Sequence, residues 1–173
     1  SKLPIKVPSD VKGLKMRTQT SKVQQATYLA LNALPTPIPF VEVYTSLQTG
    51  VLDGADIGIA DIIPMKFYEV TKYMSMTRHY FMMCPLYVSD RFLNKLDKKD
   101  QDIVIGTGEK ALDEFENAAN GFESEESLAF LRKKGMEIID VDREPFAKMT
   151  ASVISDNAES LGGAAFIDKL QAA

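Results

Sequence analysis

The stretch that decides the fold is "PFVEVYTSLQTGVLDGADIG", residues 39–58. Val43 and Leu47 stand four residues apart within it, a spacing that predicts a short amphipathic helix. We expect the Asp53-Gly54 pair to end this helix, because glycine tolerates the left-handed backbone found at helix ends. The following "ADIGIA" is small and apolar and predicts a short strand. A short helix followed at once by a strand is typical of an α/β fold.

The segments before this stretch also alternate between strand and helix. Residues 11–18, "VKGLKMRT", predict a strand, and residues 22–33 predict a helix capped by Thr20 or Ser21. The "PTPIP" of residues 35–39 cannot be helical, because proline lacks the backbone N–H that a helix needs. It predicts an extended connector or an edge strand.

The segments that follow continue the same alternation. Residues 62–74 predict a helix with Pro64 in its first turn, and residues 79–89, "HYFMMCPLYVS", predict a buried strand. Residues 98–134 look mostly helical, with glycines as weak points. The "MEIIDVD" of residues 136–142 predicts a strand, with two short helices after it.

Composition excludes several classes of protein. The chain has 173 residues, 45% of them hydrophobic, which suffices for one domain or two small lobes. A net charge of −4 without a dense basic block argues against a nucleic-acid partner. No run approaches the ~18 apolar residues of a membrane helix. The N-terminus does not read as a signal peptide, although a mature exported protein would have lost one.

The residues carry no pattern that predicts a catalytic or metal site. Metal-ligand spacing is absent, and "VIGTGEKAL" (residues 104–112) lacks the spacing of a phosphate-binding loop. His79 and Cys84, the only histidine and the only cysteine, could form a nucleophilic pair in principle. Without a supporting motif, a structural histidine is favoured. We therefore expect no catalytic residue, no metal and no cofactor.

Arg17 is the strongest candidate for ligand binding. It closes the strand "GLKMR" just before the helix expected to begin near Ser21. An arginine fork beside free helix N–H groups suits a carboxylate. The alternative is an ordinary surface ion pair, and the residues alone favour neither.

The succession "DVKGLKMRT", "PTPIPFVEVYTSLQTGVLDGAD", "MKFYEVTKYMSMTRH" and "LYVSDRFLNKL" resembles the solute-binding proteins of tripartite ATP-independent periplasmic (TRAP) transporters. The resemblance covers nearly the whole chain and implies the two-lobed α/β fold of periplasmic binding proteins. Residues 1–80 and 122–173 would form mainly the second lobe. Residues 81–121 would supply a crossing strand and a helix that belong partly to the first lobe, whose N-terminal part would be absent.

The resemblance also implies a function. The protein would bind an organic acid in the periplasm and deliver it to a TRAP membrane permease, without converting it. The alternative is a small enzyme acting on an organic acid, with Arg17 as the anchor and His79 or a carboxylate as the base.

The resemblance further implies the residues of the ligand site. Arg17 matches the family's carboxylate-binding arginine, Phe40 would pack on the ligand, and Gln19 and Met82 would line the cleft. Ile57 stands where the family often has asparagine, which predicts a less polar cleft and an apolar monocarboxylate such as a 2-oxo or aromatic acid. Alternatively, Ile57 only packs within the lobe and another residue supplies the missing hydrogen bond.

Overall fold

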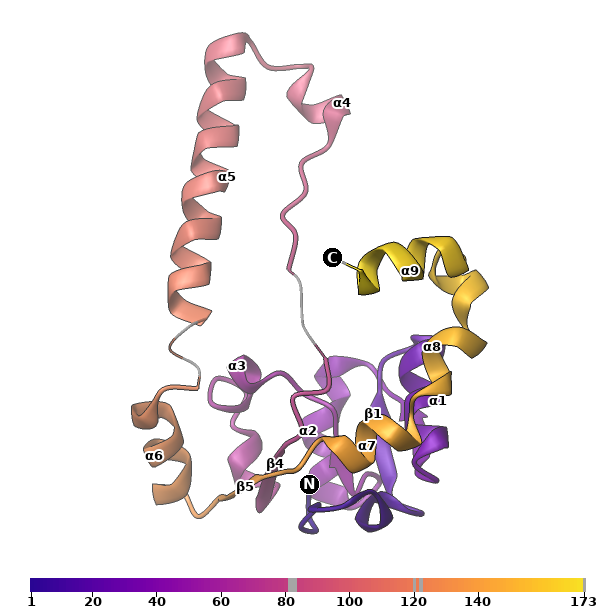
Figure 1. Cartoon of the computed structure of the whole chain (residues 1–173). Helices are drawn as coiled ribbons and strands as arrows, with labels where there is room; N and C mark the ends of the chain where they lie inside the picture. The colour runs from indigo at the N-terminus through magenta and orange to yellow at the C-terminus, as the bar shows by residue number, and fades with distance from the viewer. Residues whose placement is uncertain (81–83, 120, 122, 173) are drawn as a thin grey trace. The chain divides into compact units, whose positions relative to one another are not determined.

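The computed structural model describes residues 1–80, 84–119, 121 and 123–172 (Figure 1). The chain divides into two units, each of which is described here by itself. The first unit contains Ser1–His79 and Leu131–Ala173, and the second contains Tyr80–Phe130. The assignment of residues 1–80 and 122–173 to one lobe stays a prediction.

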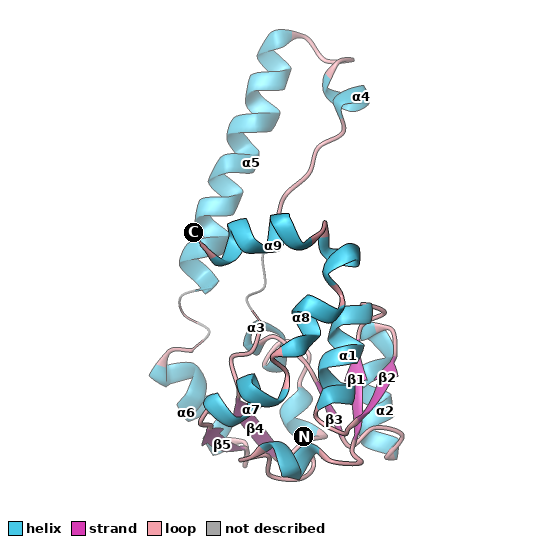
Figure 2. Ribbon diagram, turned by 45° about the vertical axis from the view of Figure 1, so that its right-hand side comes forward, coloured by secondary structure: helices cyan, strands magenta, loops and turns pink. Residues whose placement is uncertain are grey.

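Three parallel strands form the main sheet of the first unit (Figure 2). Its members are β1 (Lys15–Thr18), β2 (Leu34–Pro37) and β3 (Gly54–Ala55), in the order β2-β1-β3. Arg17, in the central strand, is in register with Thr36 of β2 and Ala55 of β3. The strand predicted within residues 11–18 and the proline-rich edge strand are both confirmed.

Helix α1 (Lys22–Ala30) makes the crossover between β1 and β2 that a parallel pair requires. The Ser21 side chain caps it by accepting a hydrogen bond from the Gln24 N–H at 3.4 Å. Tyr28 of α1 belongs to the same buried core as Met16 of β1 and Phe146 of the helix α7 (Glu144–Met149). This core contains Ile5, Val11, Met16, Tyr28, Leu31, Ala33, Val141 and Phe146.

The helix of residues 39–58 exists, but its end was predicted wrongly. A short 3-10 turn, η2 (Phe40–Glu42), leads into α2 (Val43–Thr49), which buries Val43 and Leu47 completely. The left-handed residue that ends α2 is Gly50, at φ +82°. Gly54 instead begins β3, where an added Cβ would lie 2.8 Å from the Met16 Sδ.

The helix predicted over residues 62–74 is also wrong. The helix α3 (Ile59–Ile62) takes up part of the strand expected from "ADIGIA", and the 3-10 turn η3 (Phe67–Glu69) follows it. Lys66 has a left-handed backbone at φ 55°, which interrupts any continuous helix. Residues 73–76 then form the strand β4 (Tyr73–Met76), which buries Met74 and Met76 on one face.

A second, two-stranded parallel sheet joins β4 to β5 (Glu137–Asp140), so the strand predicted in residues 136–142 is confirmed. The 3-10 turn η1 (Pro8–Val11) precedes β1. The C-terminal part holds more helical segments than the two predicted. After α7 they are α8 (Ser152–Asp156), η4 (Ala158–Leu161) and α9 (Ala164–Gln171).

The second unit consists mainly of α4 (Asp90–Leu93) and α5 (Lys98–Ala119), and α6 (Glu125–Lys133) begins in it. The helical prediction for residues 98–134 is confirmed, with a break between α5 and α6. The buried strand predicted over residues 79–89 is wrong where it can be seen, since residues 84–89 are exposed and not in a strand. Met82 and Met83 lie outside the described residues. The helices formed by the described residues are each too short or too polar to span a lipid bilayer.

Candidate functional site

The candidate site lies where the strands of the first unit end. Arg17 is the third residue of β1, Asp56 follows β3 directly, and Thr77 and His79 follow β4. In open α/β sheets, ligands bind outside the carboxyl ends of parallel strands. The fold therefore gathers these polar side chains at the edge where a ligand is expected.

Arg17 is buried, with 5% of its surface exposed. Its Nε donates to the Ile38 carbonyl oxygen at 3.1 Å, and its Nη1 donates to the Asp56 carbonyl oxygen at 3.4 Å. Its Nη2 has no acceptor in the parts of the chain that the structure describes, yet it is not sealed from solvent. Two backbone carbonyls thus fix the guanidinium, and one nitrogen remains available to a ligand.

Burial lowers the pKa of Arg17, and the nearby negative charge of Asp56 opposes this shift. The group still carries its full charge at neutral pH, because arginine does not lose its proton in proteins. A charge with little surrounding water interacts more strongly with an incoming anion than an exposed one. Arg17 is therefore a fixed cation that is suited to a carboxylate.

Phe40 forms a wall beside Arg17. The guanidinium carbon of Arg17 lies 5.7 Å from the centre of the Phe40 ring, within the range of a cation–π contact. Phe40 is half-buried and meets the buried Phe67 edge to face, with ring centres 6.0 Å apart. The Phe67 contact holds the wall in place.

Asp56 is the centre of a hydrogen-bonded cluster beside Arg17. Its Oδ2 accepts from the Gln24 Nε2 at 2.8 Å and lies 3.2 Å from the His79 Nε2. The Gln24 Oε1 in turn accepts from the Gln19 backbone N–H at 2.5 Å. The other ring nitrogen of His79 lies 2.7 Å from the Thr77 Oγ1. The cluster therefore ties together the ends of β1, β3 and β4.

The structure brings together some of the site residues predicted from the sequence, but not all of them. Arg17 and Phe40 lie together, whereas Gln19 reaches the cluster only through its backbone N–H, and its side chain is exposed. Ile57 is half-buried directly after Asp56. Met82 lies outside the described residues.

Sequence reasoning missed Gln24 and the Asp56 cluster. In the sequence, nothing distinguishes Gln24 from the other polar residues of α1, and nothing distinguishes Asp56 from the many other carboxylates. One signal was present: Asp56 lies in the segment "ADIGIA", directly before Ile57, which the resemblance had placed in the ligand site.

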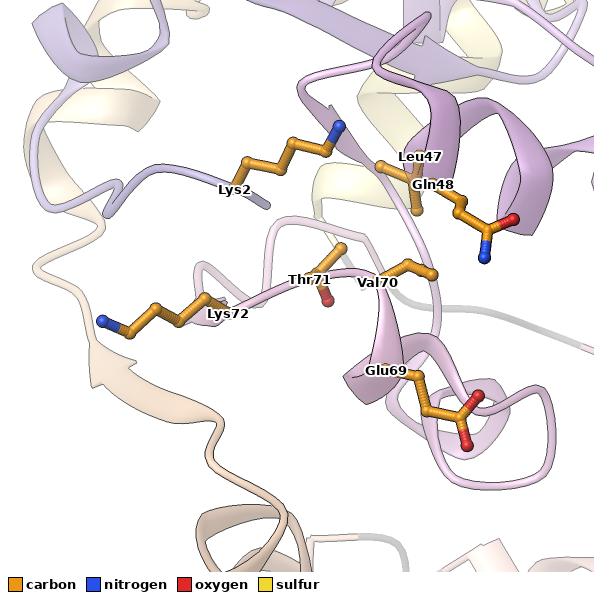
Figure 3. Close-up of a pocket in the computed structure, with 7 residues that line it drawn as sticks. All are labelled: Lys2, Leu47, Gln48, Glu69, Val70, Thr71 and Lys72. Atoms are coloured by element: carbon orange, nitrogen blue, oxygen red, sulfur yellow. The ribbon is translucent and has the colours of Figure 1, made fainter.

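The structure also contains a hollow of about 420 Å³ that is lined by residues of the N-terminal segment, of α2 and of the segment before β4 (Figure 3). Lys72, directly before β4, is among its lining residues, which are Lys2, Leu47, Gln48, Glu69, Val70, Thr71 and Lys72. Their side chains do not converge on one point (Figure 3). Glu69 accepts from the Tyr44 hydroxyl at 2.8 Å, and Lys72 pairs with Glu137 at 3.2 Å. Arg17 does not line this hollow, so we favour the strand ends as the site.

The structure also describes the surroundings of His79 and Cys84, which the sequence raised as a nucleophilic pair in principle. His79 is engaged at both ring nitrogens, and Cys84 is exposed in the second unit. Among the residues that the structure describes, no three histidine, cysteine or acidic side chains are grouped so that they could hold a metal ion.

Residues 1–160 match the family described as bacterial extracellular solute-binding protein, family 7. The chain belongs to this family. It is 33% identical over 166 residues to the C4-dicarboxylate-binding periplasmic protein DctP of Rhodobacter capsulatus, covering 92% of this chain and 49% of that relative. It is 32% identical over 163 residues to the sialic acid-binding periplasmic protein SiaP of Vibrio cholerae, covering 94% of this chain and 50% of the relative.

The fold agrees with this membership. A crystal structure of a TRAP periplasmic solute-binding protein from Polaromonas sp. JS666, bound to D-erythronate, matches with a TM-score of 0.86 and 35% identity. The match covers 94% of this chain and 54% of that one. The resemblance to TRAP solute-binding proteins and the predicted fold class are thereby confirmed. The chain spans about half the length of the curated relatives it matches.

Proposed function

We propose that the full-length protein binds an organic acid in the periplasm and delivers it to a TRAP-type membrane permease. The observation that carries this proposal is Arg17, a buried cation with its Nη2 accessible at the carboxyl end of β1. Membership of an extracellular solute-binding family supports it. The relatives add further support, because C4-dicarboxylates, sialic acid and D-erythronate all carry a carboxylate.

In this proposal, Arg17 anchors the ligand carboxylate and the Phe40 ring packs against the ligand. Ile57 and Gln19 line the cleft in this proposal. A buried arginine is favourable here because a desolvated guanidinium holds a carboxylate with strong, directional hydrogen bonds.

An enzyme acting on an organic acid is the alternative, and the position of His79 disfavours it. A general base must reach the proton that it removes, directly or through one water. Both ring nitrogens of His79 already contact side chains of the protein, Thr77 and Asp56. We therefore propose binding without turnover, and recovery of an unchanged acid after prolonged incubation with the protein is the expected result.

Replacing Arg17 tests the proposal. We expect Arg17→Ala in the full-length protein to weaken carboxylate binding by about 2–5 kcal/mol, because the ligand charge would lose its buried partner. Arg17→Lys should also bind more weakly, since an ammonium cannot reproduce the planar fork. Titration calorimetry with a panel of organic acids measures both effects.

A matched control is Arg143→Ala, which removes an exposed arginine from the same unit and should leave affinity unchanged. A loss of less than about threefold for Arg17→Ala, far below the range expected for a buried partner, would show that Arg17 is not the anchor.

A further inference from the structure

The carboxylate of Asp56 has one oxygen that the protein holds and one that it leaves open. Its Oδ2 is held by Gln24 and His79. Its Oδ1 forms no hydrogen bond with any residue in the described ranges, and it is not among the side-chain oxygens sealed from solvent there. The side chain as a whole is only 12% exposed. Asp56 thus presents a single accessible acceptor from a largely buried position.

The residue that carries this open oxygen is in direct contact with Arg17, which carries the open nitrogen. Two hydrogen bonds join the two residues, both through main-chain atoms of Asp56. The Asp56 N–H donates to the Arg17 carbonyl oxygen at 3.3 Å, and the Arg17 Nη1 donates to the Asp56 carbonyl oxygen at 3.4 Å. The site therefore offers a ligand one charged donor and one charged acceptor, both fixed before it arrives.

We propose that Asp56 determines specificity by accepting a hydrogen bond from a ligand hydroxyl while Arg17 binds the ligand carboxylate. The ligand class is a short hydroxylated organic acid. This inference rests on the proposed function and names the substrate class of the same site. It replaces the apolar acid expected from Ile57, because an apolar group against Asp56 would strip water from a carboxylate oxygen without replacing its hydrogen bond.

A hydroxyl fits this position better than an ammonium group. The Arg17 guanidinium contacts the Asp56 residue, so a ligand cation at Asp56 would also lie close to a fixed positive charge. Like charges at such distances disfavour each other in a site with little water. A neutral hydroxyl gains the charge-assisted hydrogen bond without this repulsion.

Gln24 makes the acceptor rigid. Its side chain spans from the Gln19 backbone to the Asp56 Oδ2, and it is itself 9% exposed. Asp56 therefore needs little reorganisation on binding, which favours discrimination between ligands.

The test compares four-carbon acids on the full-length protein by calorimetry. The probes are butyrate, 2-hydroxybutyrate, 2,3,4-trihydroxybutyrate and 2-aminobutyrate. We expect the hydroxylated acids to bind at least about tenfold more tightly than butyrate, in line with a hydrogen bond to a charged group. Asp56→Asn should reduce this ratio at least threefold, because Gln24 and His79 keep the amide oxygen and turn the amide nitrogen towards the ligand. Asp56→Leu should remove the preference entirely.

Arg17→Lys separates the two proposals. It should weaken binding of all four acids while leaving the ratio between hydroxylated acids and butyrate unchanged. A purely structural role of Asp56 would lower the affinity for all acids equally, and an unchanged ratio in Asp56→Asn would overturn the inference. Preference for butyrate or 2-aminobutyrate would overturn it as well. Failure of every carboxylate to bind would overturn the proposed function and, with it, this inference.

Discussion

At the scale of single residues, Thr18 has a fully buried hydroxyl whose hydrogen bonding bears on the stability of the fold. The residue is 0% exposed, and its Oγ1 makes no hydrogen bond to any residue the structure describes. Burying an unsatisfied hydroxyl costs about 1–3 kcal/mol. We therefore expect Thr18→Val, which keeps the shape of the side chain, to raise the free energy of unfolding by about 1 kcal/mol. Urea unfolding followed by circular dichroism measures the change.

Thr36 provides the matched control for Thr18. It lies on the neighbouring strand β2, and its Oγ1 donates to the Leu34 carbonyl oxygen at 3.2 Å. Thr36→Val should therefore bring no gain. Destabilisation by Thr18→Val would mean that its hydroxyl is satisfied, for example by a buried water.

The sequence proposed Arg17 and Phe40 as site residues from local signals, which are a strand end before a helix for Arg17 and a resemblance motif for both, and the structure places the two side chains together. Asp56 and Gln24 lack such a signal. Their hydrogen bond joins α1 to the end of β3, and it exists only because β1 and β3 pair in the observed register. A one-residue shift in that register would turn the site residues to the other face of the sheet. Such a contact is a property of the packed sheet and cannot be read from spacing.

At the scale of elements, α5 contains two glycines whose surroundings differ. A Cβ added at Gly106 would meet nothing within 4 Å, whereas one at Gly108 would lie 3.3 Å from the Leu86 Cδ2. Glycine inside a helix costs about 1 kcal/mol relative to alanine. We expect Gly106→Ala to stabilise α5 by nearly this amount, and Gly108→Ala to gain less because Leu86 must move. Thermal unfolding followed at the helical signal compares the two variants.

An equal gain from both variants would show that Leu86 does not press on Gly108. A loss from Gly106→Ala would show that this position is not an open helical surface.

Elements with a strong local signal were predicted better than elements that depend on distant pairing. Three prolines in residues 35–39 predicted an extended connector or an edge strand, and the edge strand is what forms, because proline has no backbone N–H to donate to a second neighbouring strand. The segment of residues 62–74 failed because its apolar residues suit either a helix or a strand. A continuous helix does not form there for two reasons. Lys66 has a left-handed backbone, and residues 73–76 pair as β4 with β5, a strand that is distant in the sequence.

At the scale of the whole molecule, the first unit is built from two separate stretches of chain. Val141 and Phe146, from the second stretch, belong to the same core as Met16 and Leu31 from the first. We therefore expect a chain in which residues 80–130 are replaced by a flexible 12-residue linker, about the length a parallel crossover needs, to fold cooperatively. Urea unfolding with a single sharp transition is the expected observation.

Residues 1–79 alone serve as the comparison. They lack β5 and the core residues Val141 and Phe146, so they should unfold without a sharp transition. Cooperative unfolding of this fragment, or its absence in the linked chain, would contradict the division of the first unit into two interdependent stretches.

The pairing of β4 with β5 has a consequence for the order in which the chain folds. The β2-β1-β3 sheet closes between residues 15 and 55, so its partners are available early as the chain emerges from the ribosome or a membrane channel. Tyr73 of β4 can pair with Glu137 of β5 only after that later segment has been made, and this contact spans a far larger sequence separation. Contacts of this kind slow folding because a long loop must close first. During that interval, the unpaired edge of β4 and its Met74 and Met76 side chains are exposed to other chains, which makes this strand the point where a chaperone would be most useful.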